Sequence, residues 1–338
     1  SRTSPKGSSR ACLCWDTNTY SRDCCDGSIQ AQGIGNITGI APAPPPVNPQ
    51  LTDATFQQAI TDILAQDPNG DYDLIPYGKI QDWDVSQVTN MSNAFFSKTN
   101  FNGDISAWDT GNVTAMSNMF SGAWNFNQNI GGWNVSSLNS MTRMFQNAFN
   151  FNQDLNSWDV GNVELMIQAF NGALSFNGII KDWNTASVTR MDSMFSGANA
   201  FNQPLNNWDV SNVTDMAGMF STAAAFNQPL NAWNTSSVTK MNNMFLGAQS
   251  FDKDISTWEV FEVTRMDEMF FGAGAFNQDL GSWDVSNVTT MLDMFNSATA
   301  YNQDLGSWSV GNVIICSGFS DNAPAWNLPK PNFTNCTP

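Results

Sequence analysis

Tryptophan recurs along this chain every 25 residues, with no insertion or deletion between the first copy and the last. The series is Trp83, Trp108, Trp133, Trp158, Trp183, Trp208, Trp233, Trp258, Trp283 and Trp308. Around each copy the unit reads Ile/Leu-x-x-Trp-Asp/Asn-Val-x-x-Val-Thr-x-Met-x-x-Met-Phe, followed by small residues and Phe-Asn-Gln-Asp. A unit of this length cannot bury its apolar face alone, so neighbouring units must stack into one continuous core. The period therefore limits the chain to a stacked repeat architecture.

The residues around each tryptophan predict how one unit folds. In Trp83-Asp84-Val85 two large apolar residues flank a polar one, which is the alternation of a strand with both apolar side chains facing inward. The apolar residues that follow have helical spacing: Val88, Met91, Ala94 and Phe95. We therefore expect a solenoid of about ten coils, each with one short parallel β-strand and one helical turn.

The segments outside the repeats differ in composition. Residues 1–40 form a polar, cysteine-containing arm, and residues 41–50 are a proline-rich spacer of the kind that adopts polyproline II. Residues 51–79 are expected to be a helical N-terminal cap, because the first coil of a stack needs a cover. Its helix would start at Thr52 or Asp53 and bury one face: Phe56, Ala59, Ile60, Ile63 and Leu64. The repeats occupy 80–313, and 314–338 would close the other end.

Six cysteines lie outside the complete repeats: Cys12, Cys14, Cys24, Cys25, Cys316 and Cys336. An even number at the chain ends is typical of disulfides formed in an oxidising compartment. Cys316 takes the place of Met91 in its unit, so we expect a Cys316–Cys336 bond that folds the tail over the last coil. The four N-terminal cysteines would pair among themselves. The alternative for those four is a zinc site, although their spacing is unlike the usual zinc motifs.

Nine Asn-x-Ser/Thr sequons agree with secretion. Their acceptors, all glycosylation candidates, are Asn36, Asn90, Asn112, Asn134, Asn212, Asn234, Asn287, Asn332 and Asn335. The repeat consensus itself generates several of them, so their number is weak evidence for glycans.

The repeat unit resembles those of the BspA-type, DUF285-like leucine-rich-repeat surface proteins. The resemblance covers the capping helix from Phe56 to Asp67, the segment Tyr77-Gly78-Lys79-Ile80-Gln81-Asp82-Trp83-Asp84-Val85, and every unit to Trp308. It implies a leucine-rich-repeat-like solenoid and an extracellular or cell-surface protein with an adhesive or structural role. It supplies no catalytic residues.

Composition excludes several functional classes. The chain carries 30 Asp and Glu against 13 Lys and Arg, a formal charge of −17, which argues against nucleic acid and anionic membrane surfaces as partners. It contains no histidine, which rules out Ser-His-Asp triads and His-ligated zinc. No apolar run approaches the roughly 18 residues expected of a membrane-spanning helix.

Three columns of repeated residues have structural interpretations. The tryptophans are expected in the core, where inward-facing rings could not act as a sugar-stacking platform. The asparagines that follow the inward phenylalanine (Asn102 and its successors) are expected to form an amide ladder that satisfies backbone groups. The acidic residues after tryptophan would form a solvated polar face; we expect Asp84, Asp109 and Asp159 to bind Ca²⁺ weakly at most, and no other cofactor.

Departures from the repeat at outward positions indicate contact surfaces. Three consecutive units carry Trp124, Phe149 and Leu174 at a position that is small or polar in later units. Leu246 and Phe271 share a second column, and Phe261 replaces a usual Ser or Gly. Exposed apolar groups in a row mark interaction sites. Alternatively, they could cover a loop or the N-terminal arm of the same chain.

The sequence therefore favours a non-enzymatic, secreted or cell-surface protein with a structural or adhesive role. We expect it to self-assemble into filaments or a matrix, with residues 1–40 docking on the Trp124 row of a neighbouring copy. The alternative is a binding module for a glycan or a cationic protein. Glycoside hydrolysis is a third hypothesis, since it needs only two carboxylates, but no acid pair stands out from the repeats.

Overall fold

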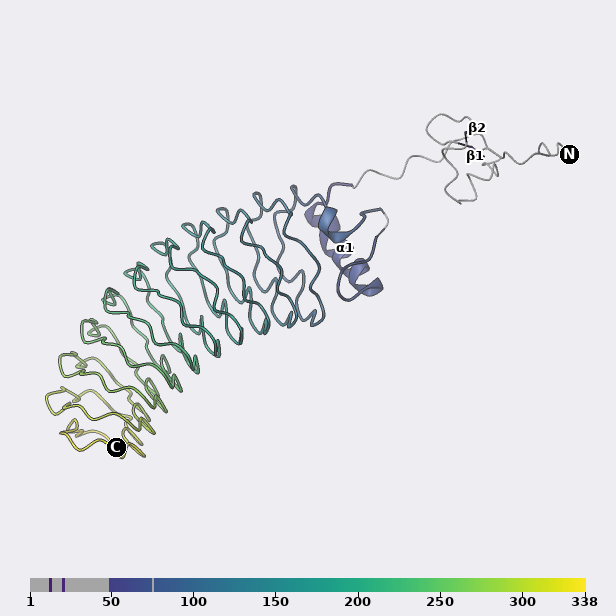
Figure 1. Cartoon of the computed structure of the whole chain (residues 1–338). Helices are drawn as coiled ribbons and strands as arrows, with labels where there is room; N and C mark the ends of the chain where they lie inside the picture. Colours follow the sequence, from purple (N-terminus) through teal and green to yellow (C-terminus); the bar gives the residue numbers. More distant parts are fainter. Residues whose placement is uncertain (1–11, 14–19, 22–48, 75) are drawn as a thin grey trace. The chain divides into compact units, whose positions relative to one another are not determined.

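The computed structural model describes residues 12–13, 20–21, 49–74 and 76–338 (Figure 1). The chain divides into two compact units, Ser1–Val47 and Asn48–Pro338. In the first unit β1 (Cys12–Leu13) pairs antiparallel with β2 (Tyr20–Ser21), with Cys12 opposite Ser21. The second unit contains helix α1 (Asp53–Gln66), the 3₁₀-helix η1 (Ile80–Asp82) and a row of stacked coils. Within the described residues, no helix combines the length and apolarity needed to cross a membrane.

Helix α1 covers the first coil, as its apolar periodicity predicts. The residues that it buries are Phe56, Ala59, Ile60, Ile63 and Leu64. The carboxylate of Asp53 accepts hydrogen bonds from the backbone N–H groups of Thr89 (2.7 Å) and Asn90 (3.1 Å) and from the Thr89 hydroxyl (2.6 Å). The Phe56 ring meets the edge of Trp108, with 5.6 Å between ring centroids. Polar bonds at its start and apolar packing along its face thus fix α1 on the repeats.

The predicted coil of one strand and one helical turn is wrong. Between residues 76 and 338 the described chain has η1, β-turns and single-residue bridges, with no strand and no α-helix, so the leucine-rich-repeat-like fold class is not found. The expected strand Trp83-Asp84-Val85 lies between two turns, closed by Trp83 N–H to Ile80 O (3.3 Å) and Val88 N–H to Val85 O (2.8 Å). Trp83 and Val85 are both buried, as the alternation predicts, but turns rather than a strand bring them inward.

The segment with helical spacing is a run of β-turns. In the first coil Ala94 N–H bonds to Met91 O (3.2 Å), and Asn93 adopts φ of 60° as the third residue of that turn, as in type II turns. Ser97, four residues later, is also left-handed, with φ of 56°. An α-helix cannot contain such residues. Turns closed between residues three apart bring nearly the same side chains inward as a helix does, which explains the error.

Adjacent coils are joined by backbone hydrogen bonds through this turn run. Met91, Asn93, Phe95 and Ser97 donate forward to the next coil, to the carbonyls of Ala115, Ser117, Met119 and Ser121, at 2.7–3.0 Å. Parallel bridges one residue long connect the coils beside it, from Asn90↔Ala115 to Thr290↔Ile315. Each bridge is too short to count as a strand, so the pairing never forms the predicted sheet.

Aromatic side chains stack through the whole core. Phenylalanines from Phe95 to Phe295 are separated from their successors by 5.2–5.8 Å between centroids. The repeat tryptophans form a second ladder, with stacked neighbours 5.9–6.4 Å apart, and all are buried, as expected. Each coil therefore buries its rings against the same rings of the coils beside it.

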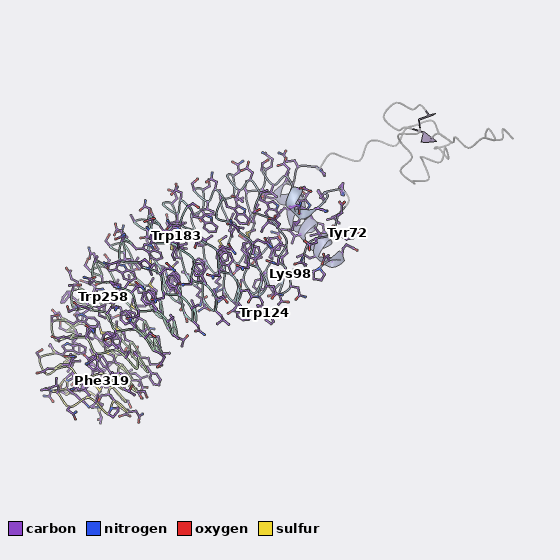
Figure 2. The ribbon with its side chains drawn as sticks, in the orientation of Figure 1. Tyr72, Lys98, Trp124, Trp183, Trp258 and Phe319 are labelled. Carbon is purple, nitrogen blue, oxygen red and sulfur yellow. A yellow bond between two sulfur atoms is a disulfide. The ribbon has the colours of Figure 1, made fainter. Side chains whose placement is uncertain are left out.

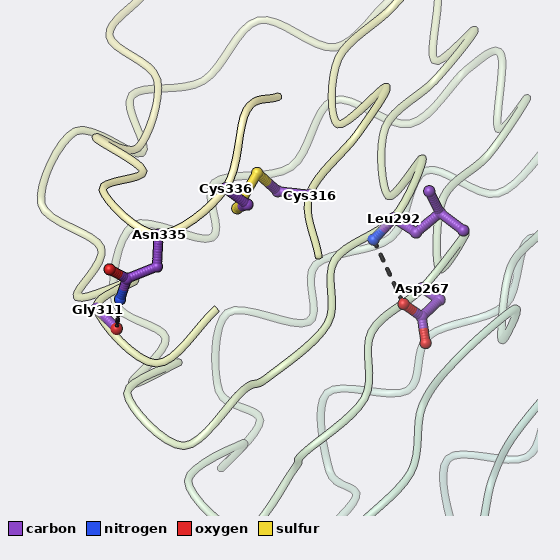
Figure 3. Close-up of a disulfide and its surroundings, with 6 residues drawn as sticks. All are labelled: Asp267, Leu292, Gly311, Cys316, Asn335 and Cys336. Carbon is purple, nitrogen blue, oxygen red and sulfur yellow. Dashed lines mark hydrogen bonds between the residues drawn. A yellow bond between two sulfur atoms is a disulfide. The ribbon is translucent and has the colours of Figure 1, made fainter. Parts of the chain in front are cut away.

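The last coil is closed by the chain's C-terminal tail. Cys316 and Cys336 form a disulfide, the pairing expected for these two residues, with 5.9 Å between their Cα atoms (Figure 3). The Phe333 ring meets the edge of Phe319 at 5.0 Å, and Asn335 donates its side-chain amide to Gly311 O (2.5 Å). Cys14, Cys24 and Cys25 lie outside the described residues, as does the side chain of Cys12, so the N-terminal pairing remains a prediction.

Candidate functional site

The strongest candidate for a contact surface is the set Trp124, Phe149 and Leu174, here called the contact row. Backbone bonds place its members on neighbouring coils: Asn150 N–H donates to Trp124 O (3.0 Å), and Ser175 N–H donates to Phe149 O (3.1 Å). The Trp124 and Phe149 rings stack with 5.4 Å between centroids and 24° between planes. Trp124 is 48% exposed and Leu174 42% exposed, whereas Phe149, between them, is half-buried.

Trp124 differs from every other tryptophan that the structure describes. The ten repeat tryptophans and Trp326 are each no more than 5% exposed. Trp124 stands instead in the small-residue stretch of its unit, and in Figure 2 it lies at the margin of the coil stack, with Lys98 nearby in that view. The repeat does not require an aromatic residue at this position, since later coils carry Asn199, Ala224 or Gly274 there.

The segments that carry the contact row contain no charged residues. The segments 121–129, 146–153 and 171–180 contain no Asp, Glu, Lys or Arg, in a chain with a formal charge of −17. Side-chain amides lie beside the rings: Asn125 and Asn150 directly follow Trp124 and Phe149, and Asn150 Nδ2 donates to Asn125 Oδ1 (3.3 Å). The surface therefore combines aromatic rings with neutral hydrogen-bonding groups.

A hollow of about 180 Å³ lies one coil before the row, between the C-terminal end of α1 and the first coil. Its lining residues are Leu64, Pro68, Ser97, Lys98, Thr99 and Asn100. Thr99 occupies the position of Trp124 one unit earlier, and its carbonyl accepts a hydrogen bond from Asn125 N–H (3.1 Å). The hollow is therefore next to the contact row, because Thr99 lines the hollow and is bonded to Asn125, the residue after Trp124.

A family model described as "Mycoplasma protein of unknown function, DUF285" matches this chain three times, over residues 72–178, 156–251 and 228–333. The chain belongs to the DUF285 family. The DUF285 resemblance inferred from the repeat unit is thus confirmed, and the matched segments include the whole contact row. No curated protein matches the chain. The family description assigns no activity, so the function of this DUF285 chain has to be argued from its own residues.

The second set of predicted contact residues is more dispersed. Leu246 and Phe271 are half-buried on neighbouring coils, where Gly247 N–H donates to Phe271 O (2.7 Å). Phe261 is 51% exposed in a different column. Phe96, also exposed, shares the column of Leu246 and Phe271 in the first coil. Sequence reasoning missed Phe96, although its position in the unit, otherwise mostly polar, could have shown it.

The acidic side chains that follow the repeat tryptophans of this DUF285 chain accept hydrogen bonds within their own turns. One carboxylate oxygen of Asp84, Asp109 and Asp159 accepts the N–H two residues later, each at 3.1 Å. The Ser86 hydroxyl donates to Asp84 (2.7 Å) and lowers the pKa of that carboxyl. Within the described residues, no group of three or more His, Cys, Asp or Glu side chains is arranged to hold a metal ion. Weak Ca²⁺ binding remains a prediction.

The asparagine ladder is present as an unbroken chain of hydrogen bonds. Asn102 Oδ1 accepts from Asn127 N–H (2.9 Å), Asn127 Oδ1 accepts from Asn152 N–H (2.9 Å), and the pattern continues to Asn327. These side chains are half-buried or exposed rather than fully buried. They supply the acceptor for a backbone N–H of the next coil, so their role is structural.

The sequons fall into two structural groups. In one group the side-chain Nδ2 donates to a main-chain carbonyl of the preceding coil, at 2.5–2.9 Å: Asn112, Asn212, Asn287 and Asn335. In the other group Oδ1 accepts the N–H two residues later, at 2.9–3.1 Å: Asn90, Asn134 and Asn234. Asn332 is exposed, and Asn36 lies outside the described residues. Glycosylation itself remains a prediction.

Sequence reasoning also missed a charged network on the bridge column. Lys240 Nζ lies 3.0 Å from Asp215 Oδ2, and Arg190 lies 2.9 Å from Asp192 and 3.8 Å from Asp215. Burial raises the pKa of Asp192, and the neighbouring Asp215 carboxylate adds to the effect, against the opposing pull of Arg190. The sequence could have predicted this network, because Arg190, Asp215 and Lys240 alternate in charge at intervals of 25 residues.

A larger hollow of about 600 Å³ lies near the C-terminal end of the stack. Asp279 and Asp304 line it with Gln303, Leu328 and Pro329, among others. Both carboxylates already accept backbone N–H groups, from Gly281 (2.8 Å) and Gly306 (2.9 Å). Both carboxylates at this hollow are therefore already hydrogen-bonded within their own turns.

Proposed function

We propose that this DUF285 chain is a non-enzymatic adhesive or structural protein that displays contact residues on a rigid stack of coils. The observation that carries the proposal is the exposed contact row. Trp124, Phe149 and Leu174 place three large apolar side chains on consecutive coils, at a position where the repeat needs none. Contiguous exposed apolar groups are costly to keep in water, and tryptophan is enriched among residues that dominate binding energy.

The stack supports this function by holding the row in a fixed geometry. Each coil is joined to the next by backbone bonds, an indole hydrogen bond and the asparagine ladder, as at Trp133 Nε1 to Ile105 O (3.1 Å) and Asn127 N–H to Asn102 Oδ1 (2.9 Å). A preformed surface loses little conformational entropy when it binds a partner. Adhesion through such a surface needs no catalytic group.

An extracellular or cell-surface location is part of the proposal. A disulfide between Cys316 and Cys336 is typical of proteins from oxidising compartments, and the sequons are compatible with secretion. The finer resemblance of the repeat unit to BspA-type surface proteins points in the same direction. The chain could also adhere to copies of itself through residues 1–40, which is the self-assembly predicted from the sequence. Most of these residues lie outside the described part of the chain.

Beads coated with the full chain test adhesion directly. We expect wild-type beads to clump or to attach to at least one of three surfaces: polysaccharide, collagen or mucin. Trp124→Ser with Phe149→Ser should abolish attachment, whereas Ile314→Ser, which removes an exposed apolar side chain of the last coil outside both sets of contact residues, should leave it unchanged. Wild-type beads that neither clump nor attach, at any density, would contradict the adhesive function.

Light scattering separates the two forms of adhesion. If the chain self-assembles, its mass should exceed that of a monomer and return to it when residues 1–50 are deleted. If the mass is monomeric while the beads still attach, the chain acts as a binding module, and assembly through the arm is wrong.

A further inference from the structure

We propose that the contact row binds a neutral polysaccharide, with one sugar ring stacked on the free face of Trp124 and the chain continuing toward the hollow beside Thr99. This inference rests on the adhesive function proposed above and names its ligand class. It is carried by the geometry of one ring, the chemistry of the groups around it, and the absence of charged residues from the segments that carry the row.

The free face of Trp124 follows from the order of residues in its column. Phe149 stacks on one side of the indole, with 5.4 Å between centroids. Thr99 holds the same position one coil earlier, and its side chain is much smaller than a ring. The indole therefore keeps an open face, backed by Phe149, which agrees with its 48% exposure. A pyranose presents an apolar C–H face of similar size, which can pack on such a ring.

The groups around that face suit the rim of a sugar. The hollow next to it combines two apolar residues of the cap, Leu64 and Pro68, with polar residues of the first coil that include Thr99 and Asn100. Asn125 adds a side-chain amide directly after Trp124. A mixture of apolar wall and a few amide and hydroxyl groups is typical of sites for small polar ligands. Hydroxyl groups can both donate to and accept from these side chains.

Charge selects among possible partners. A cationic protein would be attracted to carboxylates, yet segments 121–129 and 146–153 contain none. An acidic polysaccharide would be repelled by the formal charge of −17, and Lys98 is the one cationic residue lining the hollow. A neutral glycan neither requires a charged partner group nor suffers that repulsion. A protein partner is therefore the less favoured occupant, and the test below includes it as an outcome.

The test measures retention of the full chain on insoluble neutral polysaccharides (cellulose, chitin and mannan), with alginate beads as the acidic comparison. We expect retention on at least one neutral polysaccharide and none on alginate. Trp124→Ala should weaken binding at least about tenfold, the effect expected when a central aromatic contact is lost. Ile314→Ala, which truncates an exposed apolar side chain of the last coil that belongs to neither set of contact residues, should bind as wild type does. Both replaced side chains are exposed, so thermal unfolding should be unchanged in both variants.

Fluorescence provides an independent readout on the same site. Soluble mannan or hydroxyethyl cellulose should shift the emission of wild type more than that of Trp124→Phe, because the repeat tryptophans and Trp326 are buried and Trp15, outside the described residues, is present in both proteins. The difference between the two proteins isolates Trp124 from all other tryptophans.

Three results would overturn the inference. Retention that persists in Trp124→Ala would place the site elsewhere. Retention on alginate but on no neutral polysaccharide would show that the site prefers an acidic glycan, against the argument from charge. No retention on any polysaccharide, combined with Trp124-dependent attachment to a protein-coated surface, would identify a protein partner; the adhesive function would then stand while the glycan inference fails. If wild-type beads also fail to clump or attach anywhere, the adhesive function fails as well.

Discussion

The indole Nε1 of Trp208 donates a hydrogen bond to the carbonyl oxygen of Ile180, 28 residues earlier, at 3.1 Å. The same bond recurs in every coil from Trp108, which donates to Ile80 O, to Trp308, which donates to Leu280 O. Trp208 also stacks on Trp183, with 5.9 Å between centroids. One side chain thus joins two coils by both dispersion and a directed bond, which phenylalanine could not do.

Trp208→Phe should therefore destabilise the stack although the new ring can still pack. The variant loses a buried hydrogen bond, and the Ile180 carbonyl keeps only the weaker bond from Trp183 N–H at 3.4 Å. We expect a loss of about 1–2 kcal/mol in the free energy of unfolding, measured by urea denaturation. Trp124→Phe is the control, because its indole lies at the surface. Equal midpoints for the two variants would contradict a structural role for the bond.

The asparagine ladder predicts that an oxygen acceptor matters more than the identity of the side chain. Asp252 takes the place of asparagine in one coil, and its Oδ1 accepts from Asn277 N–H (3.0 Å). Asp252→Asn should leave stability nearly unchanged, because the amide oxygen can accept the same bond. Asn227→Ala should cost about 1–2 kcal/mol by leaving Asp252 N–H without its acceptor. Urea midpoints that rank these two variants in the opposite order would rule out the ladder as a stabilising element.

The sequence predicted which residues are buried better than it predicted the backbone that buries them. The period, the capping helix and the inward tryptophans follow from hydrophobic spacing alone. The strand and helical turn did not, because Met91 and Ala94 have the same separation on a helix and across a closed β-turn. Left-handed residues decide between the two, and the position of Asn93 holds Arg143 and Glu268 in other coils. No consistent Gly or Asn marked that position.

The contact row could be predicted from the sequence because the repeat period is constant. A fixed period assigns every residue to a column, so the amino-acid sequence alone is enough to predict that Trp124 and Phe149 are neighbours. The hollow beside Thr99 could not be predicted, because it depends on how the end of α1 rests on the first coil. Neither the period nor the helical pattern specifies that packing.

Two aspartates should respond oppositely to pH. Bonds from the Ser211 hydroxyl (2.6 Å) and Ser211 N–H (3.0 Å) lower the pKa of Asp209 below its ordinary 3.8, so its stabilising contribution is present above that value and is lost as pH falls through the folded pKa. Asp209→Asn should therefore be less stable than wild type at pH 7, and the gap should close in acid. Thermal melts from pH 7 to pH 2 would measure it; a gap independent of pH would contradict the assignment.

Asp192 provides the reverse case, because burial raises its pKa above 3.8. The folded protein then favours the protonated carboxyl, and its stability falls as pH rises from 3.8 through the raised pKa. Asp192→Asn keeps an oxygen for the bond from Arg190 Nε (2.9 Å) without the buried charge. We expect this variant to be at least as stable as wild type at pH 7, with its advantage vanishing below pH 3.8. A variant less stable than wild type at pH 7 would show that the ion pair outweighs burial.

The left-handed column that begins at Ser97 predicts a stabilising substitution. Thr222 lies in this column with φ of 55°, a conformation that is strained for a β-branched residue. Thr222→Gly should raise the free energy of unfolding by about 0.5–1 kcal/mol, since relief of strain exceeds the added chain entropy. Gly272, in the same column, has φ of 64°, and an added Cβ there would meet no atom closer than 4.0 Å. Gly272→Ala should therefore destabilise through backbone strain alone, by a similar amount. Urea midpoints that move in the same direction for both variants would show that side-chain contacts, rather than φ, control stability at this column.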